Sequence, residues 1–365
     1  ERAVKWLNSF SFPGNDIANI NVDKQGGVFY VDTALPEQTT QASLEEGPTQ
    51  AGITPTDVFS LHSKPGAANV VYVNTVGFNF SGTAWNAYTG VNEYQAKPYD
   101  TDGDSASFST SERASIAEIW HRIAEDFAPF DIDVTTQEPP VFGPNVGHIL
   151  ITGGTDAKGD LLPHGDTSSG MAYVGVWGKS SYPYYQPALV YYDNIAAGYA
   201  PYVAEAASHE LGHNLSLSHD GTSTVGYYTG HGSGVTSWAP IMGVGFYNNV
   251  TQWSKGEYPD ANNPQDDLEI IQNKLTYIND DHGNDAVFAT ALLVDNEGFI
   301  ASSNPESDPS NVRTDNKGVI ETITDIDVFY VDAGSGDINL MINPAWDAYT
   351  RPDLRGSNLD IKATL

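Results

Sequence analysis

Residues 208–220 read Ser208-His209-Glu210-Leu211-Gly212-His213-Asn214-Leu215-Ser216-Leu217-Ser218-His219-Asp220, and this stretch holds three of the chain's nine histidines. His209 and His213 stand four positions apart, so in a helix over 202–215 both imidazoles leave one face and can share a metal ion. Glu210 lies beside that pair, where its carboxylate can accept a proton from a metal-bound water. A third imidazole from His219 completes three protein ligands for zinc and leaves a fourth position open.

The order of these residues resembles the metzincin zinc metalloproteases, whose long signature is H-E-x-x-H-x-x-G-x-x-H. Ser216 stands where that signature has glycine, so we expect a turn that costs of the order of 1 kcal/mol. Residues 237–243, Ser-Trp-Ala-Pro-Ile-Met-Gly, resemble the methionine turn of this clan. The resemblance implies that Met242 forms an apolar floor beneath the site without binding the metal. Asp220, directly after the third histidine, resembles the adamalysin or reprolysin branch.

The resemblance implies an α+β catalytic domain over residues 58–278, in which a twisted mixed β-sheet carries long helices that include the zinc helix. Strand-like runs at 69–80, 131–136 and 146–152 agree with this. A capping box at 109–112 predicts an amphipathic helix to about residue 128, with His121 exposed on its polar side. In the family an edge strand above the cleft pairs with the substrate backbone, and 170–177 is the candidate here. The residues expected to make these contacts are Ala172, Tyr173, Val174 and Gly175.

Residues 1–57 differ in character from those that follow. The stretch 19–31 alternates around Lys24-Gln25-Gly26-Gly27, which predicts a hairpin, and a polar run typical of a linker comes next. We interpret this segment as the tail of a propeptide, with a simple N-terminal strand pair as the alternative. A carboxylate of a pro-segment could cap the zinc, although the sequence singles none out.

Residues 279–365 follow a polar boundary at 279–285 and alternate as strands at 318–323, 326–331 and 337–342, which predicts an all-β module. The stretch 325–330 and the run 358–361 resemble the bacterial pre-peptidase C-terminal (PPC) domain, a small β-sandwich attached to secreted peptidases. The chain ends at Leu365 within an alternating run, so we expect an incomplete, sandwich-like module.

Two acidic clusters are candidate calcium ligands. Asp100, Asp102 and Asp104 alternate in a tight loop and can converge on one hard cation, although their spacing does not fit an EF-hand. Asp325 and Asp327 lie at a predicted strand start. In both places a solvated acidic loop or edge is an equally good interpretation.

The chain is strongly acidic, with 47 Asp and Glu against 16 Lys and Arg in 365 residues and a net charge of −31. This charge argues against binding to nucleic acid or to anionic membrane surfaces, and no stretch is apolar enough to insert into a bilayer. The absence of cysteine favours a bacterial exoenzyme stabilised by its core and by calcium. With the resemblance, these features predict a secreted, extracellular monomer that acts on proteins or peptides.

Three functions are compatible with the sequence. The leading hypothesis is a zinc-dependent endopeptidase, in which Glu210 is the general base for zinc-bound water and returns the proton to the leaving amine. The alternatives are an inactive metzincin-like binding or scaffold protein, and a zinc amidase acting on cell-wall peptides. All three histidines and Glu210 are present, which argues against decay. The third histidine, the methionine turn and the candidate edge strand favour a polypeptide substrate.

Overall fold

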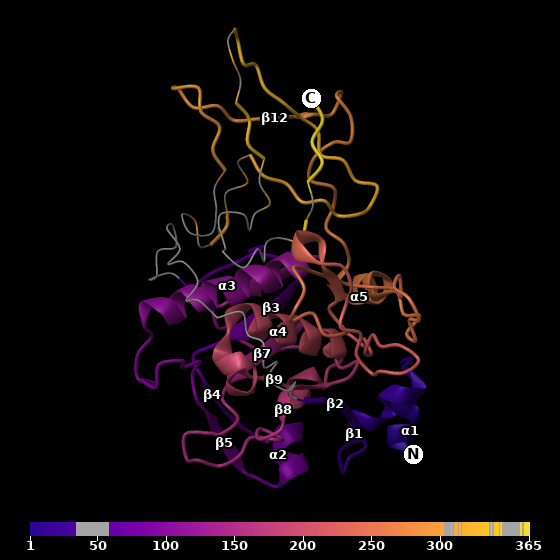
Figure 1. The fold of residues 1–365 in the computed structure, drawn as a ribbon. Coiled ribbons are helices and arrows are strands. Elements are labelled where there is room, and N and C mark those ends of the chain that lie inside the picture. The colour runs from indigo at the N-terminus through magenta and orange to yellow at the C-terminus, as the bar shows by residue number, and fades with distance from the viewer. Residues whose placement is uncertain are drawn as a thin grey trace.

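A computed structural model describes residues 1–33 and 58–302, together with 308, 310–312, 314, 316–335, 337, 339–342, 344, 358–359 and 361–365. A seven-stranded mixed sheet lies at the centre of the described part (Figure 1). Across the sheet the strands follow the order β1 (Ile20–Val22), β2 (Val28–Thr33), β8 (Ser168–Tyr173), β9 (Ala188–Tyr191), β7 (Val146–Thr152), β3 (Asn69–Asn74) and β6 (Ile132–Thr135).

The sheet combines a parallel half with an antiparallel half. β3 pairs in parallel with β6 and β7, and β7 pairs in parallel with β9. β8 runs antiparallel to β9, β2 runs antiparallel to β8, and β1 closes the predicted N-terminal hairpin against β2. In the β2–β8 register Tyr30 faces Ala172 and Asp32 faces Gly170. The N-terminal segment is therefore part of the same sheet as the strands predicted for the catalytic domain.

Two long helices cover one face of the sheet. α3 (Thr110–Asp126) and α4 (Ala200–Asn214) pack against each other, and α4 contacts β7, β8 and β9 (Figure 1). The predicted capping box starts α3, because Ser109 and Glu112 exchange side-chain and backbone hydrogen bonds. The prediction that His121 is exposed was wrong, because its side chain is buried and its ring lies 4.8 Å from that of Trp120.

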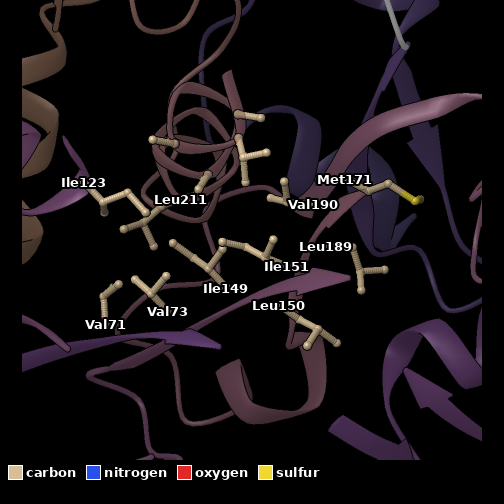
Figure 2. Packing of buried hydrophobic residues seen from close by; sticks show 14 of the residues in the cluster. Val71, Val73, Ile123, Ile149, Leu150, Ile151, Met171, Leu189, Val190 and Leu211 are labelled. Carbon is tan, nitrogen blue, oxygen red and sulfur yellow. The ribbon is translucent and has the colours of Figure 1, made fainter. Parts of the chain in front are cut away.

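Alternating side chains of the central strands fill both sides of the sheet (Figure 2). Ile149 and Ile151 lie on the same side as Leu211 of α4, whereas Leu150 and Leu189 lie on the opposite side. All five side chains are fully buried. This period of two is the expected result of strand geometry, and it fixes the position of α4 over the sheet.

Shorter elements surround this core. The strand predicted over 69–80 is interrupted at Gly77, whose φ is +82° and whose added Cβ would lie 2.7 Å from the Ala96 carbonyl oxygen. The remaining elements are α1 (Arg2–Leu7), η1 (Gly14–Ala18), β4 (Phe78–Ser81), α2 (Ala84–Thr89), β5 (Glu93–Ala96), η2 (Tyr182–Tyr185), η3 (Tyr192–Asn194), η4 (Ala196–Gly198), η5 (Gly234–Thr236), β10 (Trp238–Pro240), β11 (Val250–Gln252) and α5 (Asp267–Leu275).

The C-terminal part does not confirm the predicted all-β module. Within the described residues after 279, the only strands are β12 (Thr290–Ala291) and β13 (Phe329–Tyr330), which pair in parallel. The predicted strands at 318–323 and in the described part of 337–342 are absent, and the one at 326–331 shrinks to two residues. Ile323 and Met341 are exposed, so the alternating side chains there gain no core to pack against. The domain boundaries at 57 and 278 stay a prediction.

Candidate metal centre

Helix α4 places two histidines beside the part of the sheet that β2 and β8 form. Its sequence is rich in alanine, a strong helix former, and its residues from Val203 to Asn214 are buried. His209 and His213 leave one face of the helix, and the centroids of their rings lie 4.8 Å apart. The helix expected over 202–215 is thus confirmed with small shifts of its ends.

The chain leaves α4 through a left-handed residue and brings in the third histidine. Ser216 has a φ of +93°, a conformation that glycine adopts without strain, and the next amide, of Leu217, donates to the Gly212 carbonyl at 2.9 Å. Three residues after Ser216, His219 is fully buried, and its Nε2 lies 3.1 Å from Nε2 of His213. A serine therefore makes the turn for which the family signature has glycine.

The Nδ1 atoms of all three histidines have partners outside the site. His209 Nδ1 donates to the carbonyl of Ile241 at 2.8 Å, and His213 Nδ1 donates to that of Leu217 at 2.9 Å. His219 Nδ1 is held by the carboxylate of Asp16. Since a carbonyl oxygen only accepts, the protons of His209 and His213 are on Nδ1, and their Nε2 atoms present lone pairs to the site.

A fourth residue, Asp32 of β2, completes the cluster. Its Oδ2 lies 3.3 Å from His209 Nε2 and 3.4 Å from His213 Nε2, and its Oδ1 lies 2.9 Å from His219 Nε2. One ligand atom from each of the four residues lies within 4.8 Å of the others. Neither Asp32 Oδ2 nor His209 Nε2 has a hydrogen-bond partner, although both atoms are buried.

These residues fit a zinc ion. The lone pairs of His209 Nε2 and His213 Nε2 and the Oδ2 atom of Asp32 converge, and a cation between them would satisfy all three atoms. Three imidazole nitrogens and one carboxylate oxygen are a ligand set that tetrahedral zinc accepts. The Nδ1 hydrogen bonds hold each ring in the orientation that ligation requires.

Burial and mutual charge set the protonation of the site. Burial lowers the pKa of His213 to about 4, which keeps its imidazole neutral. Burial also opposes charge on Asp32, but the His219 and His209 imidazoles outweigh it and hold the pKa of this carboxyl well below its usual range. Burial and then the neighbouring Asp32 charge raise the pKa of Glu210 well above its usual range.

Glu210 lies between Gly170 of β8 and a cleft beside the histidines. A Cβ on Gly170 would come within 2.1 Å of Glu210 Oε1, so only glycine leaves room for the carboxylate. The Oε2 atom is buried and has no hydrogen-bond partner. The cleft is lined by His209 and Glu210 and continues along Glu205, Ala206 and the chain after the methionine turn, at Ile241, Gly243, Val244, Gly245 and Phe246.

Met242 lies beneath α4 and is fully buried within the core cluster. Its Sδ is the nearest atom, at 2.5 Å, to the position of a Cβ added at Gly212, so the helix and the turn are in tight contact. The turn also supplies the Ile241 carbonyl that holds His209. Its role as an apolar floor beneath the metal stays a prediction.

Several residues of the site were not identified from the sequence. Asp32, Asp16 and Tyr30 come from the N-terminal segment, and the Tyr30 ring stacks on His213 with centroids 4.2 Å apart. Tyr227, in the loop after Asp220, donates to Asp32 Oδ1 at 2.6 Å. The available signal was the acidic side chain of Asp32 in the run 28–33, whose first three residues are hydrophobic and buried.

The candidate edge strand at 170–177 overlaps β8, which is not an open edge. β8 ends at Tyr173, and β2 pairs along it, with the Val174 amide adding a hydrogen bond to the Val28 carbonyl at 3.0 Å. Gly175 has a φ of +62° and turns the chain toward α4, where its amide donates to the His213 carbonyl. The four residues predicted as substrate contacts therefore meet the N-terminal segment or α4 in this structure.

The candidate calcium ligands fall into different groups. Asp100 and Asp102 lie together with Glu112, and Asp104 is not part of that group. Asp325 lies with Asp280 and Glu321, whereas Asp327 lies with Asp281 and His282. Calcium at either place stays a prediction.

Comparison with known proteins identifies one related family. The model of the family described as Metallo-peptidase family M12B Reprolysin-like matches residues 66–220. The match spans β3 to Asp220 and includes the three histidines and Glu210, and it supports a metzincin-like zinc metallopeptidase domain that acts on proteins or peptides. The matched residues begin after Asp32. No curated protein and no solved structure matches the chain.

In the described residues, no helix has both the length and the apolar character needed to cross a membrane.

Proposed function

We propose that this chain is a zinc-dependent endopeptidase that hydrolyses peptide bonds of proteins, with Glu210 as its general base. The observation that carries the proposal is the convergence of three Nε2 atoms, two of them bearing lone pairs, beside a buried carboxylate that has an unpaired oxygen. The family match over residues 66–220 supports the same class.

The reaction needs a nucleophile, a proton acceptor and a proton donor at one peptide bond. Zinc, held by His209, His213 and His219, would polarise the carbonyl and acidify the attacking water. Glu210 lies next to these ligands and takes the proton of the water as it attacks. The same carboxyl group then delivers this proton to the amine nitrogen that leaves.

The sheet and the cleft supply the substrate site. β8 can offer its backbone to an extended peptide by strand addition once its edge is free. The cleft beside His209 is also lined by Thr33, the last residue of β2. It can take a substrate side chain that lies on the other side of the scissile bond from the part bound to β8. An extended polypeptide fits this arrangement better than a compact small molecule.

The setting of the enzyme is inferred from composition. The net charge of −31 and the absence of cysteine support a secreted, extracellular and bacterial protein that works as a monomer, stabilised in part by calcium. The resemblance of the C-terminal region to a PPC domain remains a sequence-based proposal.

The test compares the chain with its Glu210→Gln variant, and repeats the pair in an Asp32→Ala background because Asp32 lies among the ligands. Zinc content and cleavage of casein or a fluorogenic peptide are measured, with and without a chelator. We expect about one zinc per chain in every form, and in the Asp32→Ala background a loss of cleavage of about 100- to 10,000-fold on Glu210→Gln. A zinc-loaded Asp32→Ala chain that cleaves neither substrate, even after residues 1–57 have been removed, would support the inactive scaffold instead.

A further inference from the structure

Asp32 fills the position that a hydrolytic zinc site must keep open. Catalytic zinc has three protein ligands and leaves the fourth for water or substrate. Here the carboxylate of Asp32 lies within 3.4 Å of all three imidazole Nε2 atoms. Three histidines with one carboxylate form a closed set of four protein ligands, as in zinc sites that only stabilise a fold.

The segment that carries Asp32 also covers the strand expected to bind substrate. β2 runs along β8 with Phe29 opposite Tyr173 and Asp32 opposite Gly170. The hydroxyls of Ser168 and Ser169 both donate to the Asp32 carbonyl, at 2.9 and 3.1 Å. A peptide that used the same edge of β8 would have to displace this segment.

Noncovalent contacts at both ends of the segment hold Asp32 in place. The Trp6 indole donates to the Val174 carbonyl at 2.9 Å, and Ser218 donates to the Ser11 carbonyl. Asp16 accepts hydrogen bonds from Tyr30 and from Nδ1 of His219. Phe29 and Tyr30 are fully buried, so β2 is a packed strand and not a loosely attached one.

The positions of the histidine protons indicate that Asp32 binds a metal ion and does not accept hydrogen bonds from His209 and His213. His209 and His213 carry their protons on Nδ1, so neither can donate to the Asp32 Oδ2 that lies between them. Tyr227 donates to Oδ1 and aims the other oxygen at the two Nε2 atoms. A single cation satisfies all of these atoms together.

From this geometry we propose that the N-terminal segment 1–33 is a built-in inhibitor, in which Asp32 is the fourth zinc ligand and β2 occupies the substrate edge of β8. The enzyme is latent while the segment is docked and becomes competent when it leaves. This regulation rests on the zinc peptidase function proposed above. It also gives a role to the segment that the family match does not cover.

The experiment uses the full chain, its Asp32→Ala variant and an Asp23→Asn variant as the matched control. Asp23 is a buried carboxylate of the same hairpin, bonded to the Gln25 and Gly27 amides and to the Tyr173 hydroxyl, away from the histidines. Zinc affinity is measured by competition with a chromogenic chelator. Access to the metal is measured by the binding of acetohydroxamic acid, a ligand small enough to enter while β2 stays in place.

Loss of a ligand and opening of the site give opposite changes, which a merely structural role would not produce. In Asp32→Ala we expect zinc affinity to fall at least about tenfold while acetohydroxamate binding strengthens at least about tenfold. Cobalt-loaded protein should change its visible spectrum on acetohydroxamate addition only in this variant. Asp23→Asn should match the parent in all three measurements.

Two outcomes overturn the inference: equal zinc affinity and equal acetohydroxamate binding in the parent and Asp32→Ala, or strong acetohydroxamate binding by the parent itself. The peptidase assignment can fail separately. If Asp32→Ala opens the metal to acetohydroxamate, but the zinc-loaded protein cleaves no substrate even after residues 1–57 have been removed, Asp32 is confirmed as the blocking ligand and the endopeptidase activity is wrong.

Discussion

Gly170 and Glu210 fit together so closely that a single methyl group at Gly170 would overlap the carboxylate, with 2.1 Å between the added Cβ and Glu210 Oε1. The glycine belongs to β8 and the glutamate to α4, so the packing of strand against helix positions the proposed base. The conformational freedom of glycine is not needed here. The absence of a side chain is what matters.

Gly170→Ala should therefore displace Glu210 and lower kcat about 100-fold, since a base that is misplaced by about 1 Å loses much of its effect. Zinc content should stay at the parent value, because Gly170 supplies no ligand atom. Gly143→Ala is the control, as an added Cβ there meets nothing within 4 Å. Both are assayed in the Asp32→Ala background. Unchanged cleavage in Gly170→Ala would show that Glu210 has room to move and that this contact does not position it.

The contact between Asp16 and His219 gives a separate prediction. Asp16 binds Nδ1 of His219, and replacing it by asparagine weakens the acceptor that orients this ring. We expect zinc affinity of Asp16→Asn to fall about 10- to 100-fold in chelator competition. Asp23→Asn controls for the loss of a buried charge in the same segment. Equal affinities in all three proteins would mean that Asp16 only supports folding.

The histidines and the glutamate were predictable because local geometry decides their arrangement. Residues four apart on a helix share a face, so the metal pair follows from the sequence as soon as α4 is assigned. The same holds for the capping box of α3 and for the strand-like run 146–152 that forms β7. Each of these patterns is contained within a single element.

Asp32 and Tyr227 could not be placed in the same way. Their positions depend on pairing between β2 and β8 and on a loop that folds back over the site, neither of which leaves a periodic signal at the residues concerned. The strands predicted from alternation in the C-terminal region are largely absent from its described residues for a related reason, which is that a strand needs a partner strand. Period-two patterning at 318–323 predicts a strand only where a neighbouring strand is present to pair with it.

The left-handed conformation of Ser216 leads to a prediction about stability. A φ of +93° strains a residue that has a Cβ, and glycine relieves this strain. Ser216→Gly should raise the free energy of unfolding by about 1 kcal/mol, measured by urea denaturation of the zinc-loaded chain. Ser181, exposed and at a φ of −89°, gives the control, because Ser181→Gly should leave stability unchanged or lower it. A loss of stability in Ser216→Gly would mean that the serine side chain contributes more than the turn costs.

Burial of His148 should make the folded chain less stable in acid. Burial among Tyr72, Phe78 and Phe142 lowers the pKa of His148 to about 3, whereas an unfolded histidine titrates near 6.5. Between these values the unfolded chain binds a proton that the folded chain does not, so stability falls as pH drops below 6.5. The contribution is up to about 1.4 kcal/mol per pH unit.

The measurement is the free energy of unfolding between pH 6.5 and pH 4.5 for the parent, His148→Gln and His148→Phe. Gln retains an acceptor for the Asn74 amide, which lies 3.0 Å from His148 Nε2, and Phe does not. The two variants should differ in absolute stability but share a flatter slope with pH than the parent. Three parallel slopes would contradict a neutral, buried His148.

Glu321 provides the sharpest test of the calcium prediction. Its side chain is 6% exposed, and neither carboxylate oxygen has a hydrogen-bond partner, although Asp280 and Asp325 lie in the same group. Burial and the adjacent Asp325 raise the pKa of Glu321 to about 8, so a hard cation would relieve an unfavourable concentration of negative charge. Calorimetric titration of the zinc-loaded chain with calcium should give a Kd of about 10⁻⁴ to 10⁻³ M. Glu321→Gln should weaken binding about tenfold, while Asp337→Asn, at an exposed position outside the group, should leave it unchanged. If both variants bind calcium like the parent, these three carboxylates form a solvated acidic surface and not a calcium site.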